Sequence, residues 1–394
     1  MDQFIEEENI QELKDGKSEY TQLLDFNKNI IKEPLSKEEE NLQLHAGAAV
    51  LLDGDNSRVL YEKKGHEKRA MASTTKIMSC IIALENGDLD DTVVVSKYAS
   101  TMPDVQLNIK EGEEYRLEDL LYSLMLESHN DVAVAIAEHI GGSVEGFAKM
   151  MNTKAKELGC LNTNFVTPNG LDAEEHYTTA VEIARIASYA IKNEEFIKIT
   201  NAPNWTFEEL TTGRSFMVSN KDKFLYMYDG AIGVKTGFTN NAGYCFVGAV
   251  KKNGKTLISS VLASGWPPNR NFKWKDTSCI MDYGMENYEK KDIFYPQTFH
   301  PIYVEDGIEK KVDLYYDGEI SLLLNKNDTI KIIFKLAEKL KAPVKKDTVV
   351  GKASYYVNDQ LIKEIPIYTK DSIKQIDFDF CMNKIVSLWL IRES

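Results

Sequence analysis

Two stretches of β-type sequence stand on either side of a long helical block, and this order restricts the fold more than any other feature of the chain. The alternating and apolar runs predict strands at 48–52, 59–61, 234–236, 244–250 and 257–262. The turn sequences Asp53-Gly54 and Asn253-Gly254 separate neighbouring runs. Because the helices lie between the two groups of strands, a single sheet forms only if the first hairpin returns to pair with the last strands. We therefore predict an α/β (α+β) domain over residues 45–292, with an antiparallel sheet flanked by helices.

The helical block begins near Ser73. From there Ile77, Cys80, Ile81 and Leu84 repeat at the spacing of one buried helix face, and Gly87 gives a stop signal. Similar patterns predict further helices over 117–127, 131–140, 144–158 and 180–192. The middle of the domain is therefore expected to be helical.

The chain has 394 residues, which favours a second, smaller domain. Beyond residue 292 it continues in short β-type pieces, with hairpin-like turns at 316–318 and 357–359. We expect a small all-β, sandwich-like C-terminal domain over residues 293–370. Residues 1–44 are polar and acidic, and we interpret them as an extension outside the main core.

Charge and cysteine content exclude some classes of function. A formal net charge of −14 repels phosphate backbones, and no basic patch offsets it, so nucleic-acid binding is not expected. The 5 cysteines are far apart and lack CxxC or histidine-rich spacing. We expect neither a metal site nor a cofactor.

The two ends of the sequence bear on location. The first residues lack the basic start and apolar stretch of a secretory signal, so either the protein stays in the cytosol or its export signal lies outside this sequence. Residues 371–394 form a candidate amphipathic tail, whose apolar arc holds Cys381, Met382, Ile385, Val386, Leu388, Trp389 and Leu390. Membrane-surface contact and packing against the second domain are both compatible with this pattern, and oligomeric state is left open.

Ser73-Thr74-Thr75-Lys76 is an S-x-x-K pattern at the start of an otherwise apolar helix. A three-residue step places Ser73 and Lys76 on one helix face, one turn apart. A serine hydroxyl is a weak nucleophile until a base takes its proton, and a lysine among apolar walls and other cations can have a pKa low enough to do so. Taken alone, the pattern more often marks an N-capping serine beside a solvated lysine.

Two further triplets follow in the chain. Ser128-His129-Asn130 lies between two predicted helices, and Lys235-Thr236-Gly237 lies on a predicted strand. Separately they are compatible with an N-cap and with a strand end where glycine eases a turn. The ordered set S-x-x-K, S-x-N, K-T-G, each in the element type that its role needs, instead indicates one catalytic site with Ser73 as nucleophile.

These triplets, together with Asn169-Gly170-Leu171-Asp172 and the run 233–239, resemble the low-molecular-weight penicillin-binding proteins, which are serine-type D-alanyl-D-alanine carboxypeptidases. The resemblance covers about residues 45–370. It implies a serine β-lactamase/transpeptidase-like catalytic domain and a β-sandwich second domain. It also implies a peptidoglycan stem peptide as substrate, β-lactam antibiotics as covalent inhibitors, and a location outside the cytoplasmic membrane.

The resemblance also implies a role for each residue. Ser73 attacks the carbonyl between the two terminal D-alanines, Lys76 accepts its proton, and Ser128 relays a proton to the leaving amine. Asn130 binds the substrate amide. Lys235 and Thr236 bind the terminal carboxylate, and Gly237 allows the close approach of backbone to substrate. The backbone N–H of Phe238, the next residue, joins that of Ser73 in an oxyanion hole.

Three positions depart from the family pattern. His129 stands where a small residue is common, and a loop position favours a side chain that points to solvent over one that narrows the cleft or titrates there. Asp222 and Ile232 stand where relatives often have Asn and Asp, which leaves substrate contacts in that segment open.

Rival functions on the same fold were weighed. A β-lactamase usually has a Glu followed four residues later by an Asn, and Glu174 and Glu175 do not match that pattern. A D,D-endopeptidase would keep the same triplets, whereas a non-catalytic peptidoglycan sensor would be expected to lose one. The sequence therefore favours the carboxypeptidase.

Overall fold

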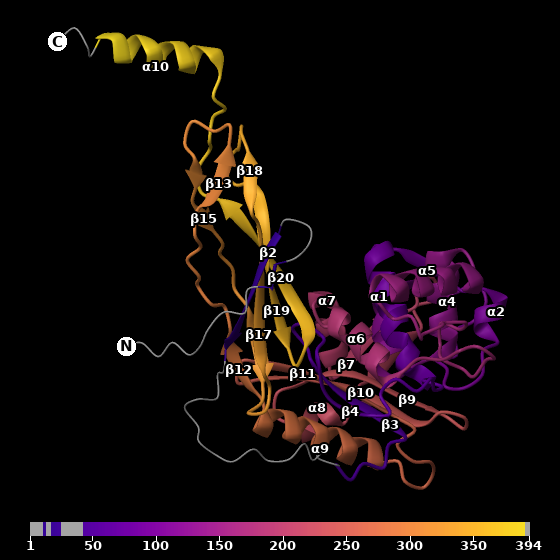
Figure 1. Ribbon diagram of the computed structural model, residues 1–394. Helices are drawn as coiled ribbons and strands as arrows, with labels where there is room; N and C mark the ends of the chain where they lie inside the picture. The colour runs from indigo at the N-terminus through magenta and orange to yellow at the C-terminus, as the bar shows by residue number, and fades with distance from the viewer. Residues whose placement is uncertain (1–10, 13–16, 25–41, 391–394) are drawn as a thin grey trace. The chain divides into compact units, whose positions relative to one another are not determined.

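The computed structural model describes residues 11–12, 17–24 and 42–390 (Figure 1). The chain divides into two compact units. We call Lys37–Glu289 the α/β unit, and Lys290–Ser394 together with Met1–Ser36 the β unit. The remainder of the predicted N-terminal extension, up to residue 41, and the last residues of the predicted tail lie outside the described residues.

The α/β unit contains one five-stranded sheet with strand order β4-β3-β11-β10-β9. Its strands are β3 (Ala48–Asp53), β4 (Val59–Lys63), β9 (Ala231–Thr239), β10 (Gly243–Lys252) and β11 (Lys255–Leu262). β11 pairs antiparallel with β3, with Leu262 opposite Ala48 and Leu257 opposite Asp53. The prediction that the first hairpin returns to pair with the last strands is confirmed, and it leaves β9 at one edge of the sheet.

The two faces of this sheet are covered by different helices (Figure 1). Val50 and Ile258 belong to the large apolar cluster that the helical block shares, whereas a Cβ at Gly284 of α9 (Phe272–Asn287) would meet Leu51 and Leu257. Because alternate residues of a strand point to opposite faces, α9 covers the face away from the helical block. The central strands β3 and β11 are therefore covered on both faces.

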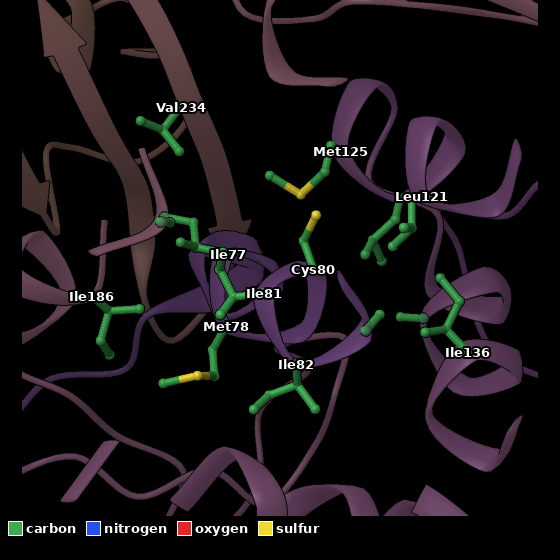
Figure 2. Close-up of a cluster of buried hydrophobic side chains, with 14 of the residues drawn as sticks. Ile77, Met78, Cys80, Ile81, Ile82, Leu121, Met125, Ile136, Ile186 and Val234 are labelled. Carbon is green, nitrogen blue, oxygen red and sulfur yellow. The ribbon is translucent and has the colours of Figure 1, made fainter. Parts of the chain in front are cut away.

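The helical block is built around α1 (Lys76–Asn86), whose side chains are buried from Lys76 to Ala83. Figure 2 shows Ile77, Ile81 and Ile82 of α1 among side chains from neighbouring helices and from β9. The sequence predicted only one buried face for this helix. The difference arises because α1 is enclosed by the sheet and the other helices rather than lying on their surface.

Among the remaining elements of the unit, the longer helices lie where the sequence predicted them. They are α3 (Leu117–Leu126), α4 (Asn130–Gly141), α5 (Val144–Glu157) and α6 (Ala180–Ala190), with the short elements β5 (Thr92–Val94), α2 (Lys97–Ser100), β6 (Glu114–Arg116), α7 (Glu194–Asn201), β7 (Asn204–Glu208), β8 (Ser215–Ser219) and α8 (Phe224–Met227). Helix α9 was not predicted from the sequence. Its buried face includes Asp276, which accepts hydrogen bonds from the backbone N–H groups of His45 and Ala46, so its polar residues hide the helical period.

The β unit is built from strands and one helix. Its strands are β1 (Gln11–Glu12), β2 (Lys17–Leu24), β12 (Glu289–Asp292), β13 (Ile302–Glu305), β14 (Lys311–Val312), β15 (Leu314–Tyr315), β16 (Ser321–Leu324), β17 (Ile330–Ala337), β18 (Lys339–Lys341), β19 (Val349–Val357) and β20 (Gln360–Thr369). The largest sheet has the order β1-β2-β17-β19-β20-β15. Alternate residues of β17, such as Ile332 and Phe334, are fully buried in its core. The all-β prediction for this region is confirmed.

Two details of the β unit differ from the sequence interpretation. β2 pairs along its whole length with β17, although residues 1–44 were interpreted as a polar extension outside the core. The polar and charged composition of β2 gives no apolar alternation that would reveal a strand. The predicted hairpin at 316–318 is also wrong, because β15 pairs with β20 and β16 with β12.

The chain's last described element is α10 (Phe378–Leu390), which falls in the predicted amphipathic tail. Its apolar side chains are exposed, Trp389 at 78% and Phe378 at 76%. Within the described residues, no helix is both long and apolar enough to cross a membrane.

Candidate active site

The first triplet lies at the junction of a short 3-10 helix, η1 (Ala72–Thr75), with α1. Ser73 is in η1, and its Oγ lies 3.1 Å from the Nζ of Lys76, the first residue of α1. No side chain caps either helix, and Lys76 is fully buried. The N-capping and solvated-lysine alternative is therefore wrong, and the hydroxyl and the amine lie together as the spacing predicted.

Buried hydrogen-bond acceptors surround the Lys76 amine. Besides its contact with Ser73, Nζ donates to the side-chain Oδ1 of Asn130 at 2.9 Å and to the backbone carbonyl of Asn169 at 2.5 Å. Burial, reinforced by the positive charge of Lys235, lowers the pKa of Lys76 well below its usual value, and the Asp131 carboxylate acts weakly in the opposite direction. The environment thus favours a neutral amine, which can accept a proton from the Ser73 hydroxyl.

The second triplet lies in the short connection between α3 and α4. Ser128 has a left-handed backbone, with φ of 72°, and its buried Oγ has no hydrogen-bond partner among the described residues. The N-cap of α4 is His129, without a side-chain cap, so the capping alternative for Ser128 is wrong. Asn130 donates to the carbonyls of Pro103 and Asp104 while its Oδ1 accepts from Lys76. Asn130 is thereby fixed beside the amine.

The expectation that His129 points to solvent is wrong. The side chain is buried, with the residue only 4% exposed, and its Nδ1 lies 2.7 Å from Ser123 Oγ of α3. Its Nε2 lies 3.5 Å from Glu127, which also pairs with Lys221. The imidazole is therefore enclosed at the junction of α3 and α4. Burial lowers its pKa, against the pull of Asp131 and Glu127, so the neutral form is favoured.

The third triplet lies on the edge strand β9, which directly approaches η1, the short helix that carries Ser73. A Cβ at Gly237 would lie 2.9 Å from the backbone nitrogen of Ser73, closer than real Cβ contacts, so only glycine allows this approach. Thr236 precedes it, and Phe238 is the exposed aromatic that follows. The strand therefore brings the K-T-G residues next to Ser73.

Lys235 is the second buried lysine of the site, with 2% of its surface exposed. Within the described part of the chain, its one hydrogen bond is a long one, 3.4 Å, to the carbonyl of Thr236. Burial lowers its pKa to about 7, with Lys273 acting in the same direction and Asp222 in the opposite one. Lys235 also acts electrostatically on Lys76, so all three triplets meet at one place.

Comparisons with known proteins agree with this arrangement. The profile of the D-alanyl-D-alanine carboxypeptidase family matches residues 35–265, and that of the C-terminal domain of penicillin-binding protein 5 matches residues 288–375. The D-alanyl-D-alanine carboxypeptidase DacF of Bacillus subtilis is 31% identical over 379 residues, which cover 93% of this chain and 96% of DacF. The chain belongs to the D-alanyl-D-alanine carboxypeptidase family.

Other relatives of this carboxypeptidase-family chain extend over both units. DacC of Escherichia coli, also a D-alanyl-D-alanine carboxypeptidase, is 28% identical over 362 residues, which cover 86% of this chain and 88% of DacC. The crystal structure of penicillin-binding protein 5 from Haemophilus influenzae has a TM-score of 0.70 and 26% identity, and the match covers 84% of this chain and 98% of that one. The family resemblance and the fold class predicted from the sequence are confirmed.

The carboxypeptidase site also contains residues that the sequence analysis did not select. Asn169, on the loop before α6, supplies the carbonyl that accepts from Lys76, and a Cβ at Gly170 would lie 2.1 Å from the carbonyl oxygen of Ala72. This loop was quoted as part of the family pattern but was given no role. The presence of a glycine at position 170 is the sequence signal that could have indicated a close backbone approach, and its φ of 83° agrees with this.

His176, on the same loop, is buried and contacts η1, the short helix that carries Ser73. Its Nδ1 accepts the backbone N–H of Val166 at 2.9 Å, so the proton is on Nε2, which lies 2.9 Å from Thr75 Oγ1. Thr75 in turn donates to the carbonyl of Ala72. Burial lowers the pKa of His176 to about 4, which keeps this linkage neutral near pH 7. A lone histidine in a loop gives no sequence signal for such a role.

The described residues of this carboxypeptidase contain no group of three or more His, Cys, Asp or Glu side chains that could hold a metal ion. What the site offers is a hydroxyl, an amine of lowered pKa, a second buried cation and an edge strand. This combination suits acyl transfer from a substrate that carries a carboxylate.

Proposed function

We propose that this enzyme removes the terminal D-alanine from peptidoglycan stem pentapeptides through an acyl-enzyme on Ser73. The observation that carries the proposal is the buried Lys76 amine, 3.1 Å from Ser73 Oγ, with a pKa lowered well below its usual value. A lysine in this state accepts the proton that makes a serine nucleophilic.

In the proposed mechanism, Ser73 Oγ attacks the carbonyl carbon between the two D-alanines as its proton passes to Lys76 Nζ. The C–N bond then breaks, and the departing amine takes a proton through Ser128, whose buried Oγ has no partner among the described residues. Water next attacks the ester, which restores the Ser73 hydroxyl and releases a peptide one residue shorter. Asn130, already bonded to Lys76, holds the substrate amide.

The specificity for a free carboxyl terminus is assigned to β9. Lys235 supplies a buried positive charge and Thr236 a hydroxyl for the terminal carboxylate. A substrate without that carboxylate would leave the buried cation unpaired, which is costly. Gly237 permits the close approach of β9 to Ser73, and the N–H groups of Ser73 and Phe238 are the proposed oxyanion hole.

We also propose that residues 45–292 form the catalytic domain and 293–370 a separate β-rich domain, in support of which the two family profiles match residues 35–265 and 288–375. The substrate places the enzyme's action outside the cytoplasmic membrane. The exposed apolar side chains of α10, Trp389 and Phe378 among them, support a role for residues 371–394 in peripheral membrane contact.

Mass spectrometry of products tests the function. The protein is incubated with a pentapeptide ending in D-Ala-D-Ala and, in parallel, with a cross-linked muropeptide. We expect release of one D-alanine from the pentapeptide, and inhibition by prior treatment with penicillin. Cleavage confined to the cross-linked substrate would contradict the proposal and favour an endopeptidase.

A further inference from the structure

The electrostatic balance of the site is uneven, because its lysines outnumber the carboxylates that face them. Lys76 and Lys235 are buried, and Lys273 of α9 is partly buried, with its ammonium 4.7 Å from the ring centre of Tyr244. Burial lowers the pKa of each of the three. Among the described residues the carboxylates that act on Lys76 or Lys235 are Asp131 and Asp222.

Asp131 already has a structural role. Its two carboxylate oxygens accept hydrogen bonds from the backbone N–H groups of Leu107, Asn108, Ile109 and Val132, at distances between 2.8 and 3.2 Å. These bonds fix the loop before β6 to the first turn of α4. Asp131 is therefore the carboxylate that holds the backbone, and its charge also acts on Lys76 and His129.

Asp222 is arranged differently. The residue is 5% exposed, and its Oδ1 accepts the backbone N–H of Phe224 at 2.9 Å. Its Oδ2 is buried and has no hydrogen-bond partner within the described part of the chain. A buried carboxylate oxygen without a partner is costly, so its retention calls for a nearby positive charge or a functional role.

The surroundings of Asp222 connect it to the strand that carries Lys235. Phe224, two residues later, contacts Phe246 of β10 edge to face, with ring centres 5.6 Å apart. Phe246 pairs with Thr236 of β9, and α8, which begins at Phe224, packs against β9, the strand that also carries Lys235. Burial raises the pKa of Asp222 to about 7, against the opposite effect of Lys235 and Lys273, and Asp222 in turn raises the pKa of Lys235. Asp222 therefore carries its negative charge in the same pH range in which Lys235 loses its proton.

We propose that Asp222 is a positioning residue of the reaction: it is the buried counter-charge that keeps the Lys235 ammonium protonated and available to the terminal carboxylate of the substrate. This inference rests on the proposed function, since it concerns how the same site binds its substrate. A neutral Lys235 amine would lose the charge-assisted part of that binding.

The pH dependence follows from the sign of the charges. Lys235 loses its proton as pH rises, so kcat/KM has an alkaline limb that follows the pKa of Lys235. Removing the negative charge of Asp222 lowers that pKa further and moves the limb to lower pH. Other charged and titratable groups also act on the Asp222–Lys235 pair. Lys273 acts on both residues and is itself influenced by Lys223, Cys245 and Arg270. Lys235 also interacts with Lys76 and His129, and both of these are influenced by Asp131.

The test compares pH profiles of kcat/KM for the pentapeptide in the full-length protein and in the variant Asp222→Asn, which keeps an acceptor for the Phe224 N–H. We expect the alkaline limb to move down by about one pH unit, the ordinary effect of one nearby opposite charge. Below the limb, kcat/KM should stay within about twofold of the parent value, since the machinery is intact. If this variant is not recovered folded, Asp222→Ser is compared in the same way.

Asp119→Asn is the matched control. Asp119 is also buried, its pKa is raised by burial, and its Oδ1 accepts from Trp205 Nε1 at 2.7 Å, but it does not act on Lys235. Its profile should match that of the parent protein. The inference would be overturned if the alkaline limb of kcat/KM lay at the same pH in Asp222→Asn and in the parent protein, or if the control variant showed an equal shift. Failure of the proposed function would appear separately, as a parent protein without carboxypeptidase turnover.

Discussion

The two units of the molecule differ in what they bury. The α/β unit encloses Lys76, Lys235, Asp131 and Asp222 among its apolar side chains. In the described residues of the β unit, Asp328 is the one buried charged residue, and the core is built from residues such as Phe334. Taking a charge out of water costs several kcal/mol unless it is compensated. In the α/β unit some buried charges hold the backbone, as Asp131 does, and others form the cluster around Ser73 to which we assign chemistry. The described core of the β unit is almost entirely apolar.

The largest effect is expected when a buried charge is removed from the α/β unit. Lys76→Met replaces the proposed proton acceptor of Ser73 with an apolar side chain of similar length. Acylation by a fluorescent penicillin should slow by about 10²- to 10⁴-fold, the usual contribution of a general base. Thermal denaturation should show unchanged or higher stability, because a buried lysine is replaced by an apolar side chain. A variant that acylates at the parent rate would contradict the role of Lys76.

The converse is expected when an apolar side chain is removed from the β unit. Phe334, at the centre of β17, is fully buried and contacts Tyr316 and Phe299 edge to face. Phe334→Ala should lower the free energy of unfolding of that unit by about 3–5 kcal/mol. Chemical denaturation measures this loss, and penicillin acylation below the transition should be unchanged. A large loss of acylation in folded protein would remove the distinction between the units.

A smaller effect is expected for the second buried cation. Lys235→Ala removes a charge-assisted contact to the substrate carboxylate, so kcat/KM for the pentapeptide should fall by about 10- to 150-fold, the equivalent of about 1.5–3 kcal/mol. Steady-state kinetics provides the measurement. A peptide amide that lacks the terminal carboxylate is the control, because its already low turnover should be affected much less. An equal loss for both substrates would mean that Lys235 acts on something other than the carboxylate.

The smallest effect concerns the tail of the β unit. Trp389→Ala removes one exposed aromatic from α10, and affinity for phosphatidylcholine/phosphatidylglycerol vesicles should weaken by about tenfold, the transfer free energy of one large side chain. Co-sedimentation of the full-length protein measures it, and turnover of a soluble pentapeptide should not change. Equal sedimentation of the parent and variant proteins would count against the anchoring role.

The comparison also explains what the sequence could predict. Strand and helix periods depend on apolar side chains, so the sheet and the longer helices could be predicted, and the triplets could be selected because their residue types and order are specific. Elements whose sequences contain polar residues at the positions that pack or pair could not be predicted in this way. Buried Asp276 hid α9, and the polar sequence of β2 hid a strand.

Parts of the site could not be predicted for a related reason. The acceptor from Asn169 is a backbone carbonyl, which leaves no mark in the sequence. His129 lies in the short connection between α3 and α4 and His176 in the long loop before α6, and only the three-dimensional structure shows that each is enclosed. The unpaired oxygen of Asp222 is likewise a property of packing rather than of sequence.

The most direct test of the account is peptide mass spectrometry of the folded protein after treatment with benzylpenicillin. The account predicts one adduct with the mass of the intact antibiotic, on the peptide that contains Ser73, and no adduct in Ser73→Ala. A correctly folded protein that stays unlabelled, or that carries its label on another residue, would contradict it.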